Sequence, residues 1–413
     1  MKTSHSFLIG LLAVCGFQQV SAAVPPEVNA AVLADEQTLA AANTDFGFKL
    51  LKLLNQSQPG ANVFISPFSA STALQMVCNG AEGETRTEIQ AMLGTEALTP
   101  AGLNAGNSNL LTALTAGQTN VILTVADALW YQEGFSINPA FLACNEQFYG
   151  ANVDAVSFTN PACVGTINAW VTEQTHGRIT SLADRSLVSA QTKVFLADAV
   201  YFKGKWASQF EGSNTKDRPF YLQGGERITV PMMNQSGQYA YQQGSGFQAV
   251  RLPYQGGSLG MYVFLPDSSS SLDKLLGVLS GPTWRQTIKP RFISQQGTIQ
   301  LPRFQMGYAV DLNQPLQTLG MKTAFSPEAD FSGISSQQLM ISKVQQKAFL
   351  EVDEEGTEAT AVTGITVVTL AVGFPISSPF QMVVDRPFLL LIEDEETQTT
   401  LFMGIILNPA TGS

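Results

Sequence analysis

The feature that most constrains the fold is a long uncharged segment near the C-terminus. After the acidic stretch that ends at Glu358, residues 359–384 contain no Asp, Glu, Lys, Arg or His. The segment is rich in Thr, Val, Ala and Gly, and residues 366–372 have the β-propensity and lack of charge that favour pairing between strands. Pro375, Pro379 and the many β-branched residues exclude a membrane-spanning helix. Two ordinary buried strands are the simplest interpretation, although so long an uncharged run differs from the rest of the chain.

The remaining composition indicates a well-buried protein with an acidic surface. Hydrophobic residues make up 45% of the 413 residues and charged residues only 13%, a balance that disordered chains do not have. The formal net charge is −11, and the 22 Lys and Arg residues are scattered along the chain. Binding of nucleic acid or heparin requires a concentrated basic patch. We therefore expect neither partner.

The first 22 residues predict a signal peptide. Lys2 supplies a positive region, residues 7–17 are mostly apolar, and small residues at 21–23 suit cleavage by signal peptidase. The apolar run is too short for a transmembrane helix. Acylation at Cys15 is an alternative, although Val14 is a poor residue directly before an acylated cysteine. We expect a secreted protein, extracellular or periplasmic, with no membrane attachment unless Cys15 is acylated.

Residues 23–413 predict one α+β domain. Helical spacing occurs at residues 35–54, 272–279 and 312–319, and Ser66-Pro67 opens a further helix because proline suits the first helical turn. Runs rich in β-branched and aromatic residues predict strands, at residues 62–65, 121–131, 193–202, 250–254, 259–265 and 298–304. No repeat and no Pro/Ser-rich linker divides the chain.

The histidine count argues against most kinds of enzyme. His5 leaves with the signal peptide, so any Ser-His-Asp or Cys-His site would depend on His176, which lies in a predicted surface turn. The GxxxxGKS/T motif is absent, and the sequence has neither a GxSxG elbow that joins a strand to a helix nor a GxGxxG that follows a strand. The 33 acidic residues leave room for a catalytic carboxylate pair, but no specific pattern supports one. We expect no enzyme activity and no cofactor.

The three cysteines of the mature chain do not indicate a metal site. Their spacing includes no CxxC, and paired histidines are lacking. Cys78 lies in an apolar helical pattern and is expected to be a buried free thiol. Cys144 and Cys163 either pair in an oxidising compartment or stay free.

Seven separated blocks of the sequence resemble the serpin family and together cover nearly the whole mature chain. They are NVFISPFS at residues 62–69, NGAEGET at 79–85, INAWV at 167–171 with Thr175 and GRI at 177–179 after it, YFKGKWASQF at 201–210, PRF at 302–304, FSPEADFSG at 325–333 and KAFLEVDEEGTEATA at 347–361. Any single block could arise by chance. Seven blocks in the family's order make the resemblance specific.

This resemblance implies a serpin fold, with three β-sheets, eight or nine helices and an exposed reactive-centre loop at about residues 356–384. It also implies a monomeric inhibitor of serine endopeptidases of chymotrypsin-like or elastase-like type, or of subtilisin-like or papain-like proteases. In such inhibitors the target endopeptidase cleaves the loop and is trapped as a covalent acyl-enzyme when the loop inserts into the central sheet. The alternative is a non-inhibitory serpin that acts as a carrier, chaperone or storage protein.

The first part of the loop, its hinge, meets the physical requirements for insertion. The hinge consists of Glu354, Glu355, Gly356, Thr357, Glu358, Ala359, Thr360, Ala361, Val362 and Thr363. At the two-residue period of a strand, residues 357, 359, 361 and 363 share one face, and all four are small and uncharged. No proline or charge interrupts that face. Gly356 supplies conformational freedom where the hinge begins.

Two bonds compete as the site of cleavage. Counting from the hinge, as the resemblance suggests, places it at Leu370–Ala371. Counting back from the strand that follows the loop places it at Ile376–Ser377, because this loop is longer than is common in the family. We favour Leu370–Ala371, since the inserted length is measured from the hinge, and Leu370 suits a protease with an apolar primary pocket.

The resemblance also implies, residue by residue, two regions of the expected fold. The point where the central sheet opens corresponds to Ser66, Ser69, Asp198 and Gln346, and the point where the loop enters corresponds to Trp206, Arg303 and Glu354, the last two as a charge pair. The sequence departs from the family at Asp198, where Asn is usual, and at Gln346, where His is usual. We expect the Gln346 amide to donate a hydrogen bond to Asp198.

Overall fold

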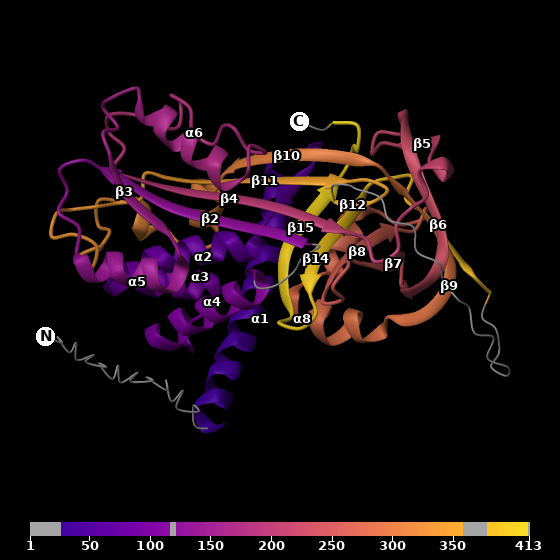
Figure 1. The fold of residues 1–413 in the computed structure, drawn as a ribbon, viewed down its shortest axis with the longest axis horizontal. Coiled ribbons are helices and arrows are strands. Elements are labelled where there is room, and N and C mark those ends of the chain that lie inside the picture. Colours follow the sequence, from indigo (N-terminus) through magenta and orange to yellow (C-terminus); the bar gives the residue numbers. More distant parts are fainter. Residues whose placement is uncertain (1–25, 116–120, 358–377, 412–413) are drawn as a thin grey trace, which may run out of the picture.

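A central sheet of six strands forms the middle of the molecule (Figure 1). The computed structural model describes residues 26–115, 121–357 and 378–411, so the predicted signal peptide and Cys15 lie outside the described residues. The central sheet has the order β10 (Phe304–Asp311), β11 (Lys343–Val352), β4 (Val194–Lys205), β2 (Val121–Gln132) and β3 (Asn152–Val156), and the short β12 (Gly356–Thr357) pairs with β4. The β4–β11 junction is parallel, whereas β4 pairs with β2 in antiparallel register.

Strand β4 is buried on both faces, as expected of a central strand. Every residue from Val194 to Phe202 is buried. Alternate side chains face two apolar layers, with Leu196, Val200 and Phe202 in the main core and Phe195, Ala197 and Ala199 in a smaller core. Helix α2 (Pro67–Cys78) covers the first face, and α6 (Cys163–Gln174) covers the second.

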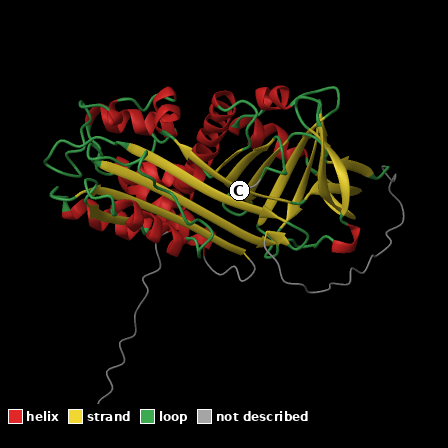
Figure 2. Cartoon of the chain, turned by 90° about the horizontal axis from the view of Figure 1, so that it is seen from above, coloured by secondary structure: helices red, strands yellow, loops and turns green. Residues whose placement is uncertain are grey.

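The second sheet has nine strands, and most helices gather around the central sheet away from it (Figure 2). Its order is β1 (Val63–Ile65), β15 (Thr399–Ile406), β14 (Phe388–Asp394), β8 (Leu259–Pro266), β7 (Phe247–Pro253), β6 (Arg227–Gly244), β9 (Ile293–Pro302) and β13 (Phe380–Val383), with β5 (Lys216–Tyr221) also on β6. We expected three sheets, but hydrogen bonding divides the described strands into two. The reason is that the 18-residue β6 pairs with both β7 and β9, and so joins two of the expected sheets into one.

The helices agree with the expected number and with the predicted segments. In the described residues they are α1 (Pro26–Ser57), α2, α3 (Gly83–Leu93), α4 (Pro100–Thr115), α5 (Pro139–Tyr149), α6, α7 (Leu272–Val278), α8 (Gly281–Thr283) and α9 (Asn313–Thr318), with short turns η1 (Gly212–Asn214), η2 (Trp284–Ile288), η3 (Lys289–Arg291) and η4 (Thr323–Phe325). Helix α2 begins at Pro67, and the Ser66 hydroxyl accepts from the Ser69 N–H at 3.3 Å, a typical N-cap. The α+β fold class is confirmed.

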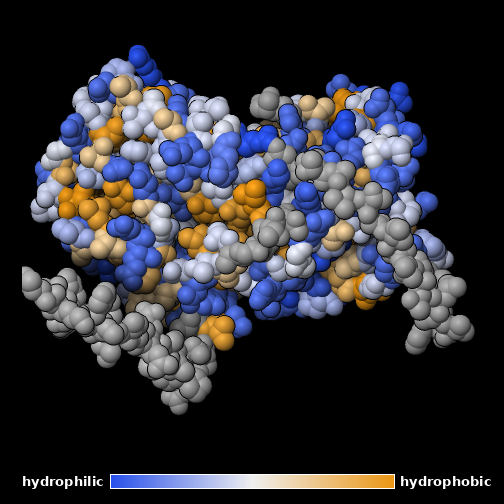
Figure 3. Space-filling view, in the orientation of Figure 1, coloured by the Kyte–Doolittle hydropathy of each residue, from blue (hydrophilic) through white to orange (hydrophobic). Residues whose placement is uncertain are grey.

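The surface of the described residues exposes few large apolar side chains. They are Leu33, Ile122, Tyr221, Val278 and Ile293. On the face of Figure 3, hydrophilic side chains separate several small hydrophobic patches. Among the helices that the structure describes, none combines the length and hydropathy needed to cross a bilayer.

The loop after α6 depends on one partly buried amide. Asn168 Oδ1 accepts from the N–H groups of Leu182 at 2.8 Å and Ala183 at 2.9 Å, and its Nδ2 donates to the Ala183 carbonyl at 2.9 Å. We predict that Asn168→Ala lowers the free energy of unfolding by about 1–3 kcal/mol, because these backbone groups lose their partner. Thermal unfolding measures this. Asn160→Ala, which removes one exposed hydrogen bond, is the control, and equal melting of the two variants would contradict the prediction.

Candidate functional site

The candidate site is the seam between β4 and β11 in the central sheet. The two strands pair directly from Lys343 opposite Phe195 to Phe349 opposite Tyr201. Beyond Tyr201 the two strands no longer pair, and the short strand β12 takes the place beside β4. Gly356 lies opposite Lys205, and Thr357 lies opposite Gly204, in antiparallel register. The start of the predicted hinge is therefore already a strand of the central sheet.

A buried polar cluster closes the seam below the hinge, and we call it the seam cluster: Ser66, Ser69, Asp198 and Gln346. All four side chains are at most 1% exposed. Gln346 Nε2 donates to Asp198 Oδ2 at 2.6 Å and to the Ser66 carbonyl at 2.9 Å, while its Oε1 accepts from the Ser66 N–H at 3.1 Å. The Ser69 hydroxyl donates to Asp198 Oδ1. The expected bond from Gln346 to Asp198 is thus present.

A second buried carboxylate, Asp127, was not among the predicted site residues. It lies directly opposite Asp198 across the β2–β4 pair, is 5% exposed, and its Oδ1 has no hydrogen-bond partner. Burial raises the pKa of Asp198 to about 7, although its bonds from Ser69 and Gln346 act in the opposite direction. Burial and then the nearby Asp198 raise the pKa of Asp127. A single acid inside the apolar run at residues 121–131 was the sequence signal that could have revealed it.

The upper end of the seam is built around Trp206. Its ring stacks on Tyr254 at 4.6 Å, and its Nε1 donates to the Asp353 carbonyl at 2.9 Å. Glu354 Oε1 accepts from the Thr215 hydroxyl at 2.7 Å and lies 3.4 Å from Arg303 Nη1. The expected Arg303–Glu354 pair is present, but Arg303 is half exposed, so the ion pair alone contributes little stability.

The hinge itself begins with a tight turn. Glu355 and Gly356 donate their N–H groups to Asp353 Oδ1, at 2.9 and 3.1 Å, and the Asp353 N–H donates to the Gly356 carbonyl at 2.9 Å. Gly356 has a φ of 145°, and a Cβ there would lie 2.2 Å from the Gly204 carbonyl oxygen. Glycine is needed here for close approach as well as for freedom.

The rest of the predicted loop lies outside the described residues. This applies to Glu358, Ala359, Thr360, Ala361, Val362 and Thr363, and to the two candidate bonds, Leu370–Ala371 and Ile376–Ser377. The described part resumes at residue 378 and enters β13.

The remaining candidate groups of the sequence do not form a site. His176 lies in a turn with a φ of 51°. Cys78, Cys144 and Cys163 are all free thiols, so the alternative of a Cys144–Cys163 disulfide is not realised. In the part of the chain that the structure describes, no three His, Cys, Asp or Glu side chains are grouped so that they could hold a metal ion.

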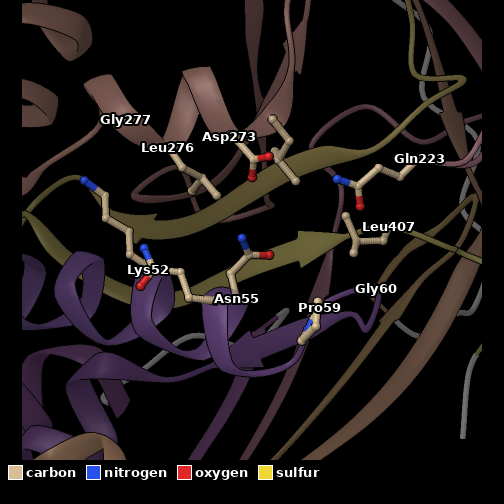
Figure 4. Close-up of a pocket in the computed structure, with 11 residues that line it drawn as sticks. Lys52, Asn55, Pro59, Gly60, Gln223, Asp273, Leu276, Gly277 and Leu407 are labelled. Carbon is tan, nitrogen blue, oxygen red and sulfur yellow. The ribbon is translucent and has the colours of Figure 1, made fainter. Parts of the chain in front are cut away.

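A pocket of about 470 Å³ lies between α1 and α7 (Figure 4). Lys52 and Asn55 of α1 face Asp273 and Leu276 of α7, and Leu407 lies beside them. The lining combines charged, amide and apolar side chains.

Comparison with known proteins identifies relatives along nearly the whole chain. The family model Serpin (serine protease inhibitor) matches residues 41–409. The leukocyte elastase inhibitor of Bos taurus is 36% identical, and the match covers 90% of this chain and all of that protein. Human neuroserpin is 31% identical, and the match covers 89% of this chain and 91% of that protein. The solved structure of human thyroxine-binding globulin has a TM-score of 0.82 at 27% identity, covering 91% of this chain and 99% of the other. The chain belongs to the serpin family of serine protease inhibitors.

Proposed function

We propose that this serpin is a secreted inhibitor, not an enzyme, and that it traps a target endopeptidase by inserting its cleaved loop into the β4–β11 seam. The observation that carries the proposal is the β12–β4 pairing of Gly356 and Thr357. A strand that has begun to form beside β4 can lengthen along it without a new nucleation step. Secretion is inferred from the predicted signal peptide at residues 1–22. We further propose a monomer without nucleic-acid or heparin partners.

The register of β12 defines where each later loop residue would lie. Because Thr357 pairs with Gly204, residues 359, 361 and 363 would fall opposite Phe202, Val200 and Asp198. Those β4 side chains face the main core and the seam cluster. The loop face with only small, uncharged residues would thus be the face that packs against α2, where a charge would be costly.

The same register would bring Thr363 into the seam cluster. Asp353 pairs with Gly356 in the hinge turn, so continuing the turn as a hairpin with β11 sets Thr363 opposite Gln346 as well as Asp198. Insertion must separate these two residues, which would leave a buried carboxyl and a buried amide without each other. The Thr363 hydroxyl can donate to one and accept from the other, which would replace the broken contact.

The register also favours Leu370–Ala371 over Ile376–Ser377 as the cleaved bond. Strand β4 begins at Val194, and Leu370 would fall at the level of residue 191, just beyond that end. Ile376 would fall at the level of residue 185, well past any partner strand. Cleavage after Leu370 would therefore use the full length of β4. A leucine before the bond fits a chymotrypsin-like or elastase-like target, and the relation to leukocyte elastase inhibitors supports this class.

The direct test is incubation with chymotrypsin-like, elastase-like, subtilisin-like and papain-like proteases. We expect a complex that survives SDS, and a released fragment whose N-terminus is Ala371. Thr357→Arg should be cleaved but should not trap, because it would bury a charge on the core-facing side of the inserting strand. Glu358→Arg adds the same side chain to the opposite face and is the control. Clean cleavage of the wild-type protein without a complex would exclude trapping.

A second prediction concerns pH. Because burial raises the pKa of Asp198 from the ordinary 3.8 to about 7, the folded protein favours the neutral carboxyl more than the unfolded chain does. Its contribution to stability is complete below 3.8 and is lost as the pH rises through about 7. We expect the difference in Tm between Asp198→Asn and wild type to shift in favour of the variant between about pH 5 and pH 8. A difference that does not change with pH would contradict this.

A carrier function is the second candidate, and the pocket between α1 and α7 is the observation that favours it. Human thyroxine-binding globulin, a structural neighbour, was solved in complex with thyroxine. Equilibrium binding of thyroxine, with Leu276→Arg as the variant that fills the pocket, measures this alternative. Saturable binding that the variant abolishes, together with cleavage without trapping, would favour a carrier over an inhibitor.

A further inference from the structure

The turn that starts the hinge is held by a side chain that the matching blocks did not single out as a site residue. Asp353 Oδ1 accepts two consecutive backbone N–H groups, those of Glu355 and Gly356. In the same turn the Asp353 N–H and carbonyl are bonded to the Gly356 carbonyl and to Trp206 Nε1. All three polar groups of Asp353 are therefore engaged. Bonds from a carboxylate to backbone N–H groups are stronger than bonds between neutral groups.

The turn connects two strands whose positions are already fixed. Val352, the last residue of β11, pairs with Phe304 of β10. On the other side of the turn, the Glu354 carbonyl accepts from the Phe210 N–H at 2.7 Å and the Glu355 carbonyl accepts from the Trp206 N–H at 3.0 Å. The register of β12 relative to β11 therefore depends on the shape of this turn. Asp353 is the side chain whose hydrogen bonds close the turn.

Register matters in this loop because its two faces differ in charge. Along β4, alternate side chains face α2 and α6, and insertion with Thr357 opposite Gly204 turns the uncharged residues toward α2. A shift by one residue exchanges the faces of a strand. Such a shift would turn the Glu358 carboxylate toward Phe202 and Val200, and it would move Thr363 away from the seam cluster. An inserted loop in the wrong register would bury a charge and leave Asp198 without a replacement donor.

We propose that Asp353 is a positioning residue for trapping, which fixes the register in which the loop enters the sheet. The proposal rests on the proposed function, since register matters only if the loop inserts. In the proposed mechanism, insertion of the loop competes kinetically with hydrolysis of the acyl-enzyme. Loss of the Asp353 turn would slow insertion in the productive register and let more protease escape. Cleavage occurs many residues from the turn, so the encounter with the protease would stay unchanged.

The test compares three variants of the full-length mature protein. Asp353→Ala removes the acceptor, and Asp353→Asn retains an oxygen at the same place. Asp184→Ala is the matched control, because Asp184 Oδ1 also accepts two backbone N–H groups, those of Ser186 at 2.7 Å and Leu187 at 3.1 Å, in a loop outside the seam. For each protein, titration against a fixed amount of chymotrypsin-like protease gives the number of inhibitor molecules consumed per protease trapped. Progress curves give the association rate constant.

We expect Asp353→Ala to raise the number consumed per trapped protease by about three- to tenfold, as the loss of charge-assisted hydrogen bonds implies. The association rate, corrected for that number, should change by less than about twofold. Asp353→Asn should restore most of the wild-type value, and Asp184→Ala should match wild type. An unchanged consumption in Asp353→Ala, or an equal rise in Asp184→Ala, would overturn the proposal.

Hydrogen exchange of a peptide that spans residues 353–357 separates this proposal from the proposed function. If wild-type protein traps no protease, the inhibitory function itself fails, and the exchange experiment still decides whether Asp353 holds the turn. We expect faster exchange in Asp353→Ala than in Asp353→Asn or wild type. Equal exchange in all three would show that the carboxylate does not fix the turn, and the proposal would fail on that result alone.

Discussion

The parallel junction of β4 and β11 is the contact on which the rest of the structure depends. Both strands lie in the middle of the central sheet, and β4 is buried under α2 on one face and α6 on the other. The direct ladder covers residues 343–349 and 195–201 only, and the seam cluster lies within it. Above the ladder the two strands separate and leave room for β12. The sheet is therefore closed in its lower part and already open at its upper end.

In the proposed mechanism, the balance of backbone bonds would favour one further strand in the central sheet. Opening the junction costs a single ladder of backbone bonds and the contacts of Gln346, while an inserted strand forms ladders with both β4 and β11. Each bond contributes only about 0.5–1.5 kcal/mol net, so the gain depends on many bonds and on burial of the apolar loop. The seam cluster opposes a premature opening because separation leaves buried polar groups unpaired, which is costly. In the proposed mechanism the Asp353 turn and Gly356 would keep the incoming strand aligned, so that closure and insertion would use the same residues of β4.

Local sequence patterns predicted many of the helices and strands. They did not predict the register between strands that are far apart in the sequence. Ser66-Pro67 indicated the start of α2, alternation and β-branching indicated the strands, and the resemblance to the serpin family predicted the bond between Asp198 and Gln346. The pairing of Asp127 with Asp198 could not be predicted, because it depends on which residues of two distant strands lie opposite one another. The Asp353 turn was missed because an Asp before two Glu residues in an acidic run resembles an exposed surface. The continuity of β6 through two expected sheets likewise depends on partners far away in sequence.

We infer that the intact protein is less stable than the same chain after cleavage of its loop, because the cleaved loop would gain a place between β4 and β11. The most direct measurement is thermal unfolding of the intact protein and of protein cut within residues 358–377 by a protease that it does not trap. We predict that the cut protein melts at a much higher temperature than the intact one. Equal or lower melting of the cut protein would contradict it.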